Sequence, residues 1–227
     1  MRPARLSEPK ILAVDTCFGA CSAAVVEGAR ILARQTIAME RGHAEALAPM
    51  VEAVMAAGGL SFAALDRLAV TTGPGSFTGQ RVGLAFMRGL RLALQKPLLG
   101  VTSLAAMAEQ ARRETGRMVA AAVHDAKRGE VYLALRGAEL PAQIMTAAAA
   151  EAVLAPFVGL ALAGTAAPLF AKEDRAVTAI LAPDAVWVAR LAAAQDTSGI
   201  PRPLYLRPPD AKLPGGLPGP LAGVLKA

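Results

Sequence analysis

Ile11-Leu12-Ala13-Val14-Asp15 is the stretch that decides the fold of this chain. Four consecutive apolar residues predict a buried strand, and this strand would deliver the acid to a sheet edge. A turn is predicted at residues 16–20, and two further strands follow at 22–26 and 30–36, joined by a hairpin turn at Glu27-Gly28. The chain is therefore expected to open with antiparallel strands.

The second half of the chain repeats this order of elements. Residues 118–123 predict an apolar strand, His124-Asp125 follows it, and a turn at 126–129 leads into a returning strand at 130–136. Asp125 therefore holds the place in this half that Asp15 holds in the first. The repetition predicts an α/β fold of two similar lobes, each a mixed β-sheet with flanking helices.

Apolar periodicity and turn residues predict the remaining elements. Helices are expected at 43–57, 76–95, 102–114, 146–154 and 183–195, and strands at 68–70, 98–101, 159–164 and 176–181. The last helix is expected to begin at Pro183, because proline is favoured in a first helical turn.

These elements divide into two lobes. The N-terminal lobe is expected at residues 10–101, with the segment 183–207 returning to it, and the C-terminal lobe at 102–182. Residues 208–227 are rich in Pro and Gly and are expected to be disordered.

The composition excludes a largely disordered chain. Hydrophobic residues make up 54% of the 227 residues and charged residues 19%, which allows a sizeable core. The formal net charge of +6 permits contact with RNA. However, the basic clusters at Arg112-Arg113 and Lys127-Arg128 lack interleaved aromatic residues, and this favours a solvated basic face. Cys17 and Cys21 are too few for a disulfide framework and are expected to be reduced.

No feature of the sequence predicts contact with a membrane. Residues 1–10 are polar and contain no apolar signal segment, so a cytoplasmic location is expected. The uncharged stretch at 152–170 is interrupted by two prolines and two glycines, and we interpret it as a helix end, a strand and a loop.

The sharpest motif is Gly-Pro-Gly-Ser-Phe-Thr-Gly-Gln-Arg-Val-Gly at residues 73–83, between a strand and a helix. Glycines let backbone amides approach a ligand, and a helix N-terminus favours anions, so a phosphate site is one interpretation. A tight turn with a closely packed helix is the other. The motif is not a Walker A loop, because Gln80 stands where that loop has lysine.

Three glycines in the following helix are unusual. Gly79, Gly83 and Gly89 each cost about 1 kcal/mol relative to Ala in a helix interior. Glycines four residues apart flatten one face of a helix, so that another backbone can approach. The neighbour is either the protein's own sheet or a helix of a partner, and from the combination we predict a docking face for a partner helix.

Several segments, in the same order and over nearly the whole chain, resemble the TsaB family, also called YeaZ. The most specific is the motif at 73–83, in which Gln80 replaces the usual Leu. The other similar segments are 11–16 with 21–23, 43–50, 100–104, 124–132 and 203–207.

This resemblance implies an actin-like, RNase H-like fold related to the M22 glycoproteases. It implies a non-catalytic role beside TsaD, which transfers a threonylcarbamoyl group to N6 of adenosine 37 in certain tRNAs, with the ATPase TsaE as a third member. It further implies a homodimer through the same helices that bind TsaD, and only indirect contact with tRNA. No cofactor is expected in this chain, and ATP and Mg²⁺ would belong to the partners.

The resemblance also implies where partners bind, on the helices at 43–57 and 76–95. The predicted partner-binding residues are His43, Leu47, Met50, Val54, Phe77, Gly79, Val82, Gly83, Phe86 and Leu90.

A second set of candidate residues concerns phosphate binding. In actin-like folds, acids at these two strand ends face the metal and the phosphates of a nucleotide, and two carboxylates could hold a hydrated magnesium ion. The candidate residues are Asp15, Gly73, Gly75, Ser76 and Asp125. The alternative, which we favour, is that each acid caps its own turn by binding backbone amides.

No catalytic residue and no metal ligand is predicted. The catalytic relative holds its metal with a His-x-x-x-His pair, whereas His43 and His124 are 81 positions apart. Two alternatives stay open: an M22-type metallopeptidase-like or nucleotide-hydrolysing enzyme, and a direct tRNA-binding module.

Overall fold

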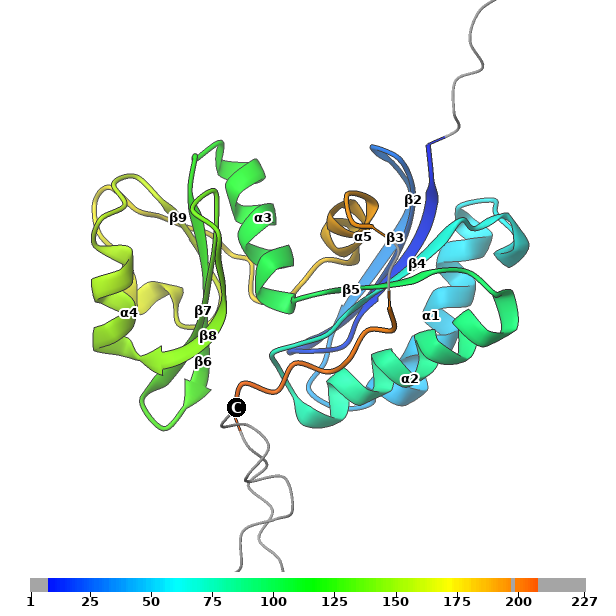
Figure 1. Ribbon diagram of the computed structural model, residues 1–227, viewed down its shortest axis with the longest axis horizontal. Helices are drawn as coiled ribbons and strands as arrows, with labels where there is room; N and C mark the ends of the chain where they lie inside the picture. Colours follow the sequence, from blue (N-terminus) through cyan, green and yellow to red (C-terminus); the bar gives the residue numbers. More distant parts are fainter. Residues whose placement is uncertain (1–7, 197–198, 208–227) are drawn as a thin grey trace, which may run out of the picture.

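Two five-stranded mixed sheets organise the computed structural model, which describes residues 8–196 and 199–207 (Figure 1). The strand order is β3-β2-β1-β4-β5 in the first sheet and β10-β9-β6-β7-β8 in the second. In each sheet the central strand has one antiparallel neighbour, β2 or β7, and one parallel neighbour, β4 or β9. The prediction of two similar lobes with mixed sheets is confirmed.

The first sheet is buried on both faces, which explains the continuous apolar run of its central strand. Leu12 and Val14 face one core, and Ile11 and Ala13 face another. Helices α1 and α2 cover the first face, and α5 covers the second. The elements of this lobe are β1 (Lys10–Asp15), β2 (Ala20–Glu27), β3 (Arg30–Ala38), α1 (His43–Ala57), the short 3₁₀ helix η1 (Phe62–Ala64), β4 (Arg67–Thr71), α2 (Phe77–Leu94), β5 (Leu98–Val101) and α5 (Ala185–Ala193).

The second sheet is covered in the same way. Helix α3 packs on one face, and α4 with the 3₁₀ helix η2 packs on the other. The elements are α3 (Ser103–Thr115), β6 (Ala120–Lys127), β7 (Glu130–Arg136), β8 (Leu140–Thr146), α4 (Ala147–Leu154), β9 (Ala161–Ala163), η2 (Ala167–Phe170) and β10 (Ala176–Val177).

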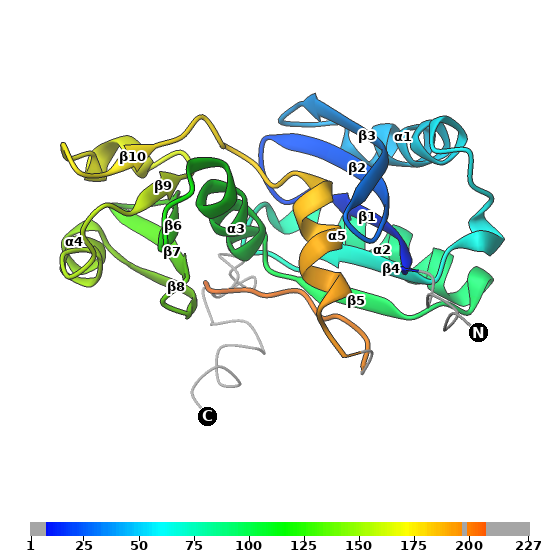
Figure 2. The ribbon, with the colours of Figure 1, turned by 90° about the horizontal axis from the view of Figure 1, so that it is seen from above.

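Helices α3 and α5 lie side by side between the two sheets, which Figure 2 shows from above. Ala106 of α3 belongs to the same apolar cluster as the buried face of α5. The middle of the molecule is therefore shared by both lobes, and α1 and α2 lie on the side of the first lobe away from the second (Figure 1). No helix within residues 8–196 and 199–207 is long and apolar enough to span a bilayer.

Some predicted boundaries are wrong. Strand β6 continues through His124 and Asp125 to Lys127, with a register shift after Asp125, so these two residues lie within the strand. Helix α5 begins at Ala185 because the Asp184 side chain caps it by accepting from the Val186 amide at 2.8 Å, and Pro183 precedes the cap.

Other differences concern short strands. The strand predicted at 159–164 shrinks to β9, and the one at 176–181 to the two residues of β10. The edge strand β8 was not predicted at all. The expectation of disorder at 208–227 lies outside the described residues.

Candidate functional site

The glycine-rich loop after β4 is closed by the chain's own backbone. The Ser76 amide donates to the Cys17 carbonyl at 2.7 Å, and the Thr16 hydroxyl donates to the Gly79 carbonyl at 2.7 Å. A β-carbon on Gly75 would lie 2.3 Å from the Cys17 carbonyl oxygen. The connection between β1 and β2 therefore occupies the space into which a phosphate cradle would open.

Gln80 completes the closure of this loop. Its buried side chain lies beside Gly73, where an added β-carbon would come within 2.7–2.8 Å of its terminal atoms, and its Nε2 donates to the Gly75 carbonyl at 3.0 Å. The Ser103 hydroxyl donates to the Pro74 carbonyl at 2.5 Å. The departure from the family motif at position 80 therefore fills the loop and helps to fasten it to the start of α2.

The geometry favours a tight turn at residues 73–76 over a phosphate site. Ser76 caps α2 by accepting from the Gly79 amide at 3.3 Å, as an N-cap residue does. Among the five candidate phosphate residues, Asp15 is fully buried in the first lobe and Asp125 is exposed on the second. Among the residues that the structure describes, no hydrogen bond joins Asp125 to any of the other four.

Asp15 is held inside the first lobe by neighbours at the strand ends. The Thr71 hydroxyl donates to its Oδ1 at 2.5 Å, and the Cys17 amide donates to the same atom at 3.2 Å. Its Oδ2 is buried and has no hydrogen-bond partner. Burial raises the pKa of the Asp15 carboxyl to about 7, although these hydrogen bonds oppose the shift.

Asp125 is exposed and binds its own turn. The Lys127 amide donates to Oδ1 at 2.8 Å and Lys127 Nζ donates to Oδ2 at 2.9 Å, and these bonds lower the pKa of the carboxyl. Asp15 and Asp125 thus each accept from the amide two residues further on, which is the turn-capping alternative. Within the described ranges, no three His, Cys, Asp or Glu side chains are grouped to hold a metal ion.

Phe18, in the same connection between β1 and β2, contacts both lobes. Its ring stacks on the His124 ring of β6 with 3.8 Å between centroids, and its carbonyl lies 3.2 Å from His43 Nε2 at the start of α1. Burial lowers the pKa of His124 to about 4, so the imidazole is neutral near pH 7. Residues 16–18 therefore contact α1, α2 and the second lobe.

The surface of α1 and α2 differs from the predicted docking face. Gly79 and Gly83 are buried against the chain itself: added β-carbons would lie 2.0 Å from the Thr16 carbonyl oxygen and 2.6 Å from the Thr16 hydroxyl, respectively. The steric reason for placing a partner helix on these two glycines is therefore wrong. Gly89, by contrast, is exposed and would have no atom within 4 Å of an added β-carbon.

The other predicted partner-binding residues divide into two groups. His43, Leu47, Met50 and Val54 are buried, and the last three belong to the core under α1, so they are not available to a partner. Phe77 is 46% exposed, and Val82, Phe86 and Leu90 are half-buried along α2. The structure keeps these four at the surface.

Small residues that are absent from the predicted partner-binding set lie at exposed positions of both helices. They are Ala44, Ala48 and Ala53 on α1, and Ala85, Gly89 and Ala93 on α2. Helical periodicity could have found the three on α2, because each lies away from the buried positions of that helix. It could not have found Ala44 and Ala48, because they lie two turns before the buried residues Val51 and Met55. We call these six residues, with Val82, Phe86 and Leu90, the docking face.

The comparisons with known proteins agree on one family. Residues 30–198 match the family described as TsaD: tRNA N6-adenosine threonylcarbamoyltransferase. The tRNA threonylcarbamoyladenosine biosynthesis protein TsaB of Escherichia coli is 38% identical over 125 residues, which are 55% of this chain and 54% of that protein. The chain thus matches about half the length of this relative.

Two further matches extend the comparison. A tRNA N6-adenosine threonylcarbamoyltransferase of Erythrobacter litoralis is 47% identical over 64 residues, 28% of this chain and 19% of that enzyme. The solved structure of YeaZ from Pseudomonas aeruginosa is 31% identical, with a TM-score of 0.72 over 87% of this chain and 100% of that one. The fold of the matched 87% of this chain is therefore shared with YeaZ.

Proposed function

This chain belongs to the TsaB (YeaZ) family, and we propose that it is a non-catalytic subunit that binds and activates TsaD during formation of N6-threonylcarbamoyladenosine in tRNA. In this proposal TsaD transfers the threonylcarbamoyl group to adenosine 37, TsaE joins the pair, and ATP and Mg²⁺ belong to the partners. In the absence of TsaD, the same face forms a homodimer.

The observation that carries the proposal is the docking face of α1 and α2. Exposed Ala44, Ala48, Ala85 and Gly89 leave the helix surfaces flat, so that a partner helix can approach closely. Beside them, Val82, Phe86 and Leu90 offer apolar side chains that are only partly covered by the chain's own core. Burying such a face against matching helices is a favourable route to association.

The similarity to the TsaD family suggests the form of that partner. The match over residues 30–198 includes both helices of the docking face, so TsaD is expected to carry a comparable pair. Two related surfaces can associate around an approximate two-fold axis, as two identical ones do in a homodimer. One docking face would therefore serve TsaD and a second copy in turn.

The alternative of an enzyme acting alone has less support. The loop that a nucleotide phosphate would need is filled by the Thr16–Cys17 backbone and by Gln80. Calorimetry with ATP and Mg²⁺ on the purified protein tests this rival directly, and micromolar binding by the isolated chain would favour it over a purely accessory role.

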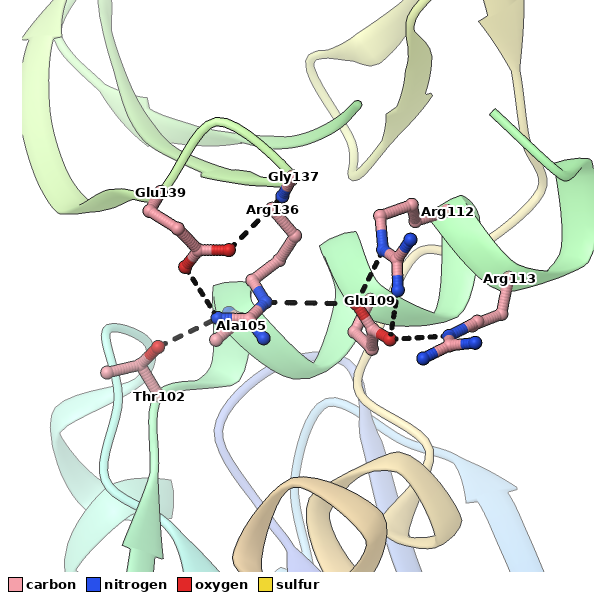
Figure 3. Close-up of polar contacts among 8 residues, drawn as sticks. All are labelled: Thr102, Ala105, Glu109, Arg112, Arg113, Arg136, Gly137 and Glu139. Carbon is pink, nitrogen blue, oxygen red and sulfur yellow. Dashed lines mark hydrogen bonds and ion pairs between the residues drawn. The ribbon is translucent and has the colours of Figure 1, made fainter. Parts of the chain in front are cut away.

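Direct binding of tRNA through the predicted basic clusters also has less support. Figure 3 shows Glu109 surrounded by arginines: it accepts from Arg112 Nε and Nη2 at 2.8 Å each and from Arg113 Nε at 2.7 Å. In the other cluster, Lys127 pairs with Asp125. These charges are partly neutralised within the protein. Direct binding would require an affinity for tRNA that falls steeply with salt.

The proposal is tested by binding of the cognate TsaD to two matched variants. Ala85→Trp adds a bulky ring to the exposed face of α2, and Ala148→Trp makes the same change on exposed α4 of the second lobe. We expect Ala85→Trp to weaken TsaD binding by at least tenfold and Ala148→Trp to leave it unchanged. Equal binding by both variants would remove the docking face from the proposal.

A further inference from the structure

The segment at residues 201–207, here called the strap, borders α2 and reaches the second lobe. Its Leu204 amide donates to the Thr72 carbonyl at 2.7 Å, and Arg88 Nη2 donates to the Pro201 carbonyl at 2.5 Å. At its far end Arg207 pairs with Glu130 at the start of β7. Figure 1 shows this segment in orange, crossing from the first lobe toward the second.

An aromatic cluster holds the strap against the N-terminal end of α2. Arg81 Nε donates to the Tyr205 hydroxyl at 3.0 Å, and the Arg81 guanidinium lies over the Phe77 ring at 3.7 Å from its centroid. The Phe77 and Tyr205 rings contact each other at 5.2 Å between centroids. The side chains at positions 77, 81 and 88 project toward the strap, whereas those at 82, 86 and 90 pack toward α1 and its core. The exposed ridge of α2 thus lies between α1 and the strap.

The two borders of α2 carry opposite charges. Helix α2 contains Arg81, Arg88 and Arg91 and no acid, and the strap contains Arg202 and Arg207 and no acid. Of these five arginines, only Arg207 forms an ion pair within the described residues. On the other side, α1 carries Glu45 and Glu52 and no Lys or Arg.

A groove continues the basic border at the C-terminal end of α2. Arg91 and Lys96 line it together with Leu92 and Ile200, and its lining contains no acidic residue. Leu92 is 73% exposed and Ile200 is 52% exposed. Apolar side chains at the surface beside unpaired cations are suited to a partner surface that combines carboxylates with aliphatic residues.

We propose that the docking surface extends from α2 onto the strap, and that this half of it receives an acidic face of TsaD. The inference rests on the proposed function and specifies the partner's chemistry. Opposite charges across a rim accelerate encounter and fix the register of the two surfaces, and their effect is screened by salt. Arg81, Arg91 and Arg202 are the residues that would select the acidic face.

The charge pattern also explains how one surface can accept two occupants. With two-fold symmetry, a second copy would place Glu45 and Glu52 of its α1 opposite the basic α2 and strap. A related partner with acids on its corresponding helix would do the same. TsaD is the occupant proposed for the functional complex, and the homodimer is the competing occupant in the test.

The test compares Arg202→Glu with Arg30→Glu in TsaD binding at about 50 mM and 500 mM salt. Both arginines are exposed, both substitutions change the net charge equally, and Arg30 lies on β3, at the opposite edge of the sheet from the strap. We expect Arg202→Glu to weaken TsaD binding about three- to tenfold at low salt and much less at high salt, with a slower association rate. Arg30→Glu should stay within about twofold of the wild type.

The remaining outcomes separate this inference from the proposed function. If Ala85→Trp weakens TsaD binding and Arg202→Glu does not, the basic border is not part of the surface and the inference is overturned, while the function stands. If Arg202→Glu dissociates only the homodimer in sedimentation, the acidic face belongs to a second copy and the assignment to TsaD is wrong. If wild-type protein does not bind TsaD at all, both proposals fail.

Discussion

The carbonyl oxygen of Thr16 lies 2.0 Å from the position that a β-carbon on Gly79 would take, and the Thr16 hydroxyl donates to the Gly79 carbonyl at 2.7 Å. The first turn of α2 is therefore in direct backbone contact with the connection between β1 and β2. This contact explains a glycine near the start of a long helix, because any larger residue would have to displace backbone.

Gly79→Ala is predicted to destabilise the protein by about 2–4 kcal/mol, because the added methyl group meets backbone that cannot rotate away. Gly89→Ala is the matched control on the same helix, where an added β-carbon has no atom within 4 Å. It should stabilise the protein by about 0.5–1 kcal/mol, since alanine is the better helix former. Thermal unfolding followed by circular dichroism measures both changes.

The sign of the difference decides this prediction. For a chain of this size each kcal/mol corresponds to about 2–4 °C in Tm. The Tm of Gly79→Ala should therefore lie below that of the wild type, and the Tm of Gly89→Ala above it. A Gly79→Ala protein that melts with or above the wild type would show that the Thr16 contact is not as close as described.

Asp15 is predicted to make stability fall as pH rises. Its pKa is about 7 in the folded protein against an ordinary value of 3.8, so the folded state binds the proton more tightly. The stabilisation is complete below about pH 4 and is lost as pH rises through about 7. Asp15→Asn keeps a neutral group of the same shape at every pH. The free energy of unfolding of this variant, relative to that of the wild type, should therefore be about 2–4 kcal/mol higher at pH 8 than at pH 4.

Urea unfolding at pH 4, 6 and 8 measures this difference, with Asp125→Asn as the control. The folded-state pKa of Asp125 is lowered by Lys127, so its stabilisation is present at neutral pH and is lost only as pH falls below the ordinary value. A difference between Asp15→Asn and the wild type that does not change with pH would mean that Asp15 does not titrate in this range.

His124 is predicted to make the stability of the protein fall as pH falls. Its pKa is about 4 in the folded protein against an ordinary 6.5, so stability is lost as pH falls from about 6.5 through 4. Its Nδ1 is buried without a partner, and its ring stacks on Phe18. His124→Phe keeps an aromatic ring and removes the titration, so its advantage over the wild type should grow by about 1–3 kcal/mol between pH 7.5 and pH 4.5.

The same urea series, with points added at pH 4.5 and 7.5, checks this expectation for the interface between the lobes. If the Phe variant and the wild type lose stability in parallel as pH falls, the imidazole is not protonated on unfolding and its buried position is wrong.

The local sequence pattern predicted two kinds of element: strands that are apolar on both faces, and helices with regularly spaced apolar residues. The runs at 11–15 and 68–70 and the helix at 43–57 appear as β1, β4 and α1, because continuous or regularly spaced apolar residues report burial directly. Strand β8 escaped prediction because Pro141 and Gln143 alternate with half-buried residues at a sheet edge. The length of β6 escaped because His124 and Asp125 are polar, although His124 is buried in the strand with its ring stacked on Phe18.

The sequence by itself determined the order of the elements, the repetition of the lobes and the resemblance to the TsaB family, because these depend on local apolar pattern and motif order. Only the tertiary structure decided which way the glycines of α2 face and which charges border the docking face. A glycine has no side chain whose polarity could indicate burial or exposure. The sequence therefore could not distinguish Gly79, which packs against Thr16, from Gly89, which lies at the surface. The charge of a surface, in turn, depends on segments such as the strap and α2 that lie more than a hundred residues apart in the chain.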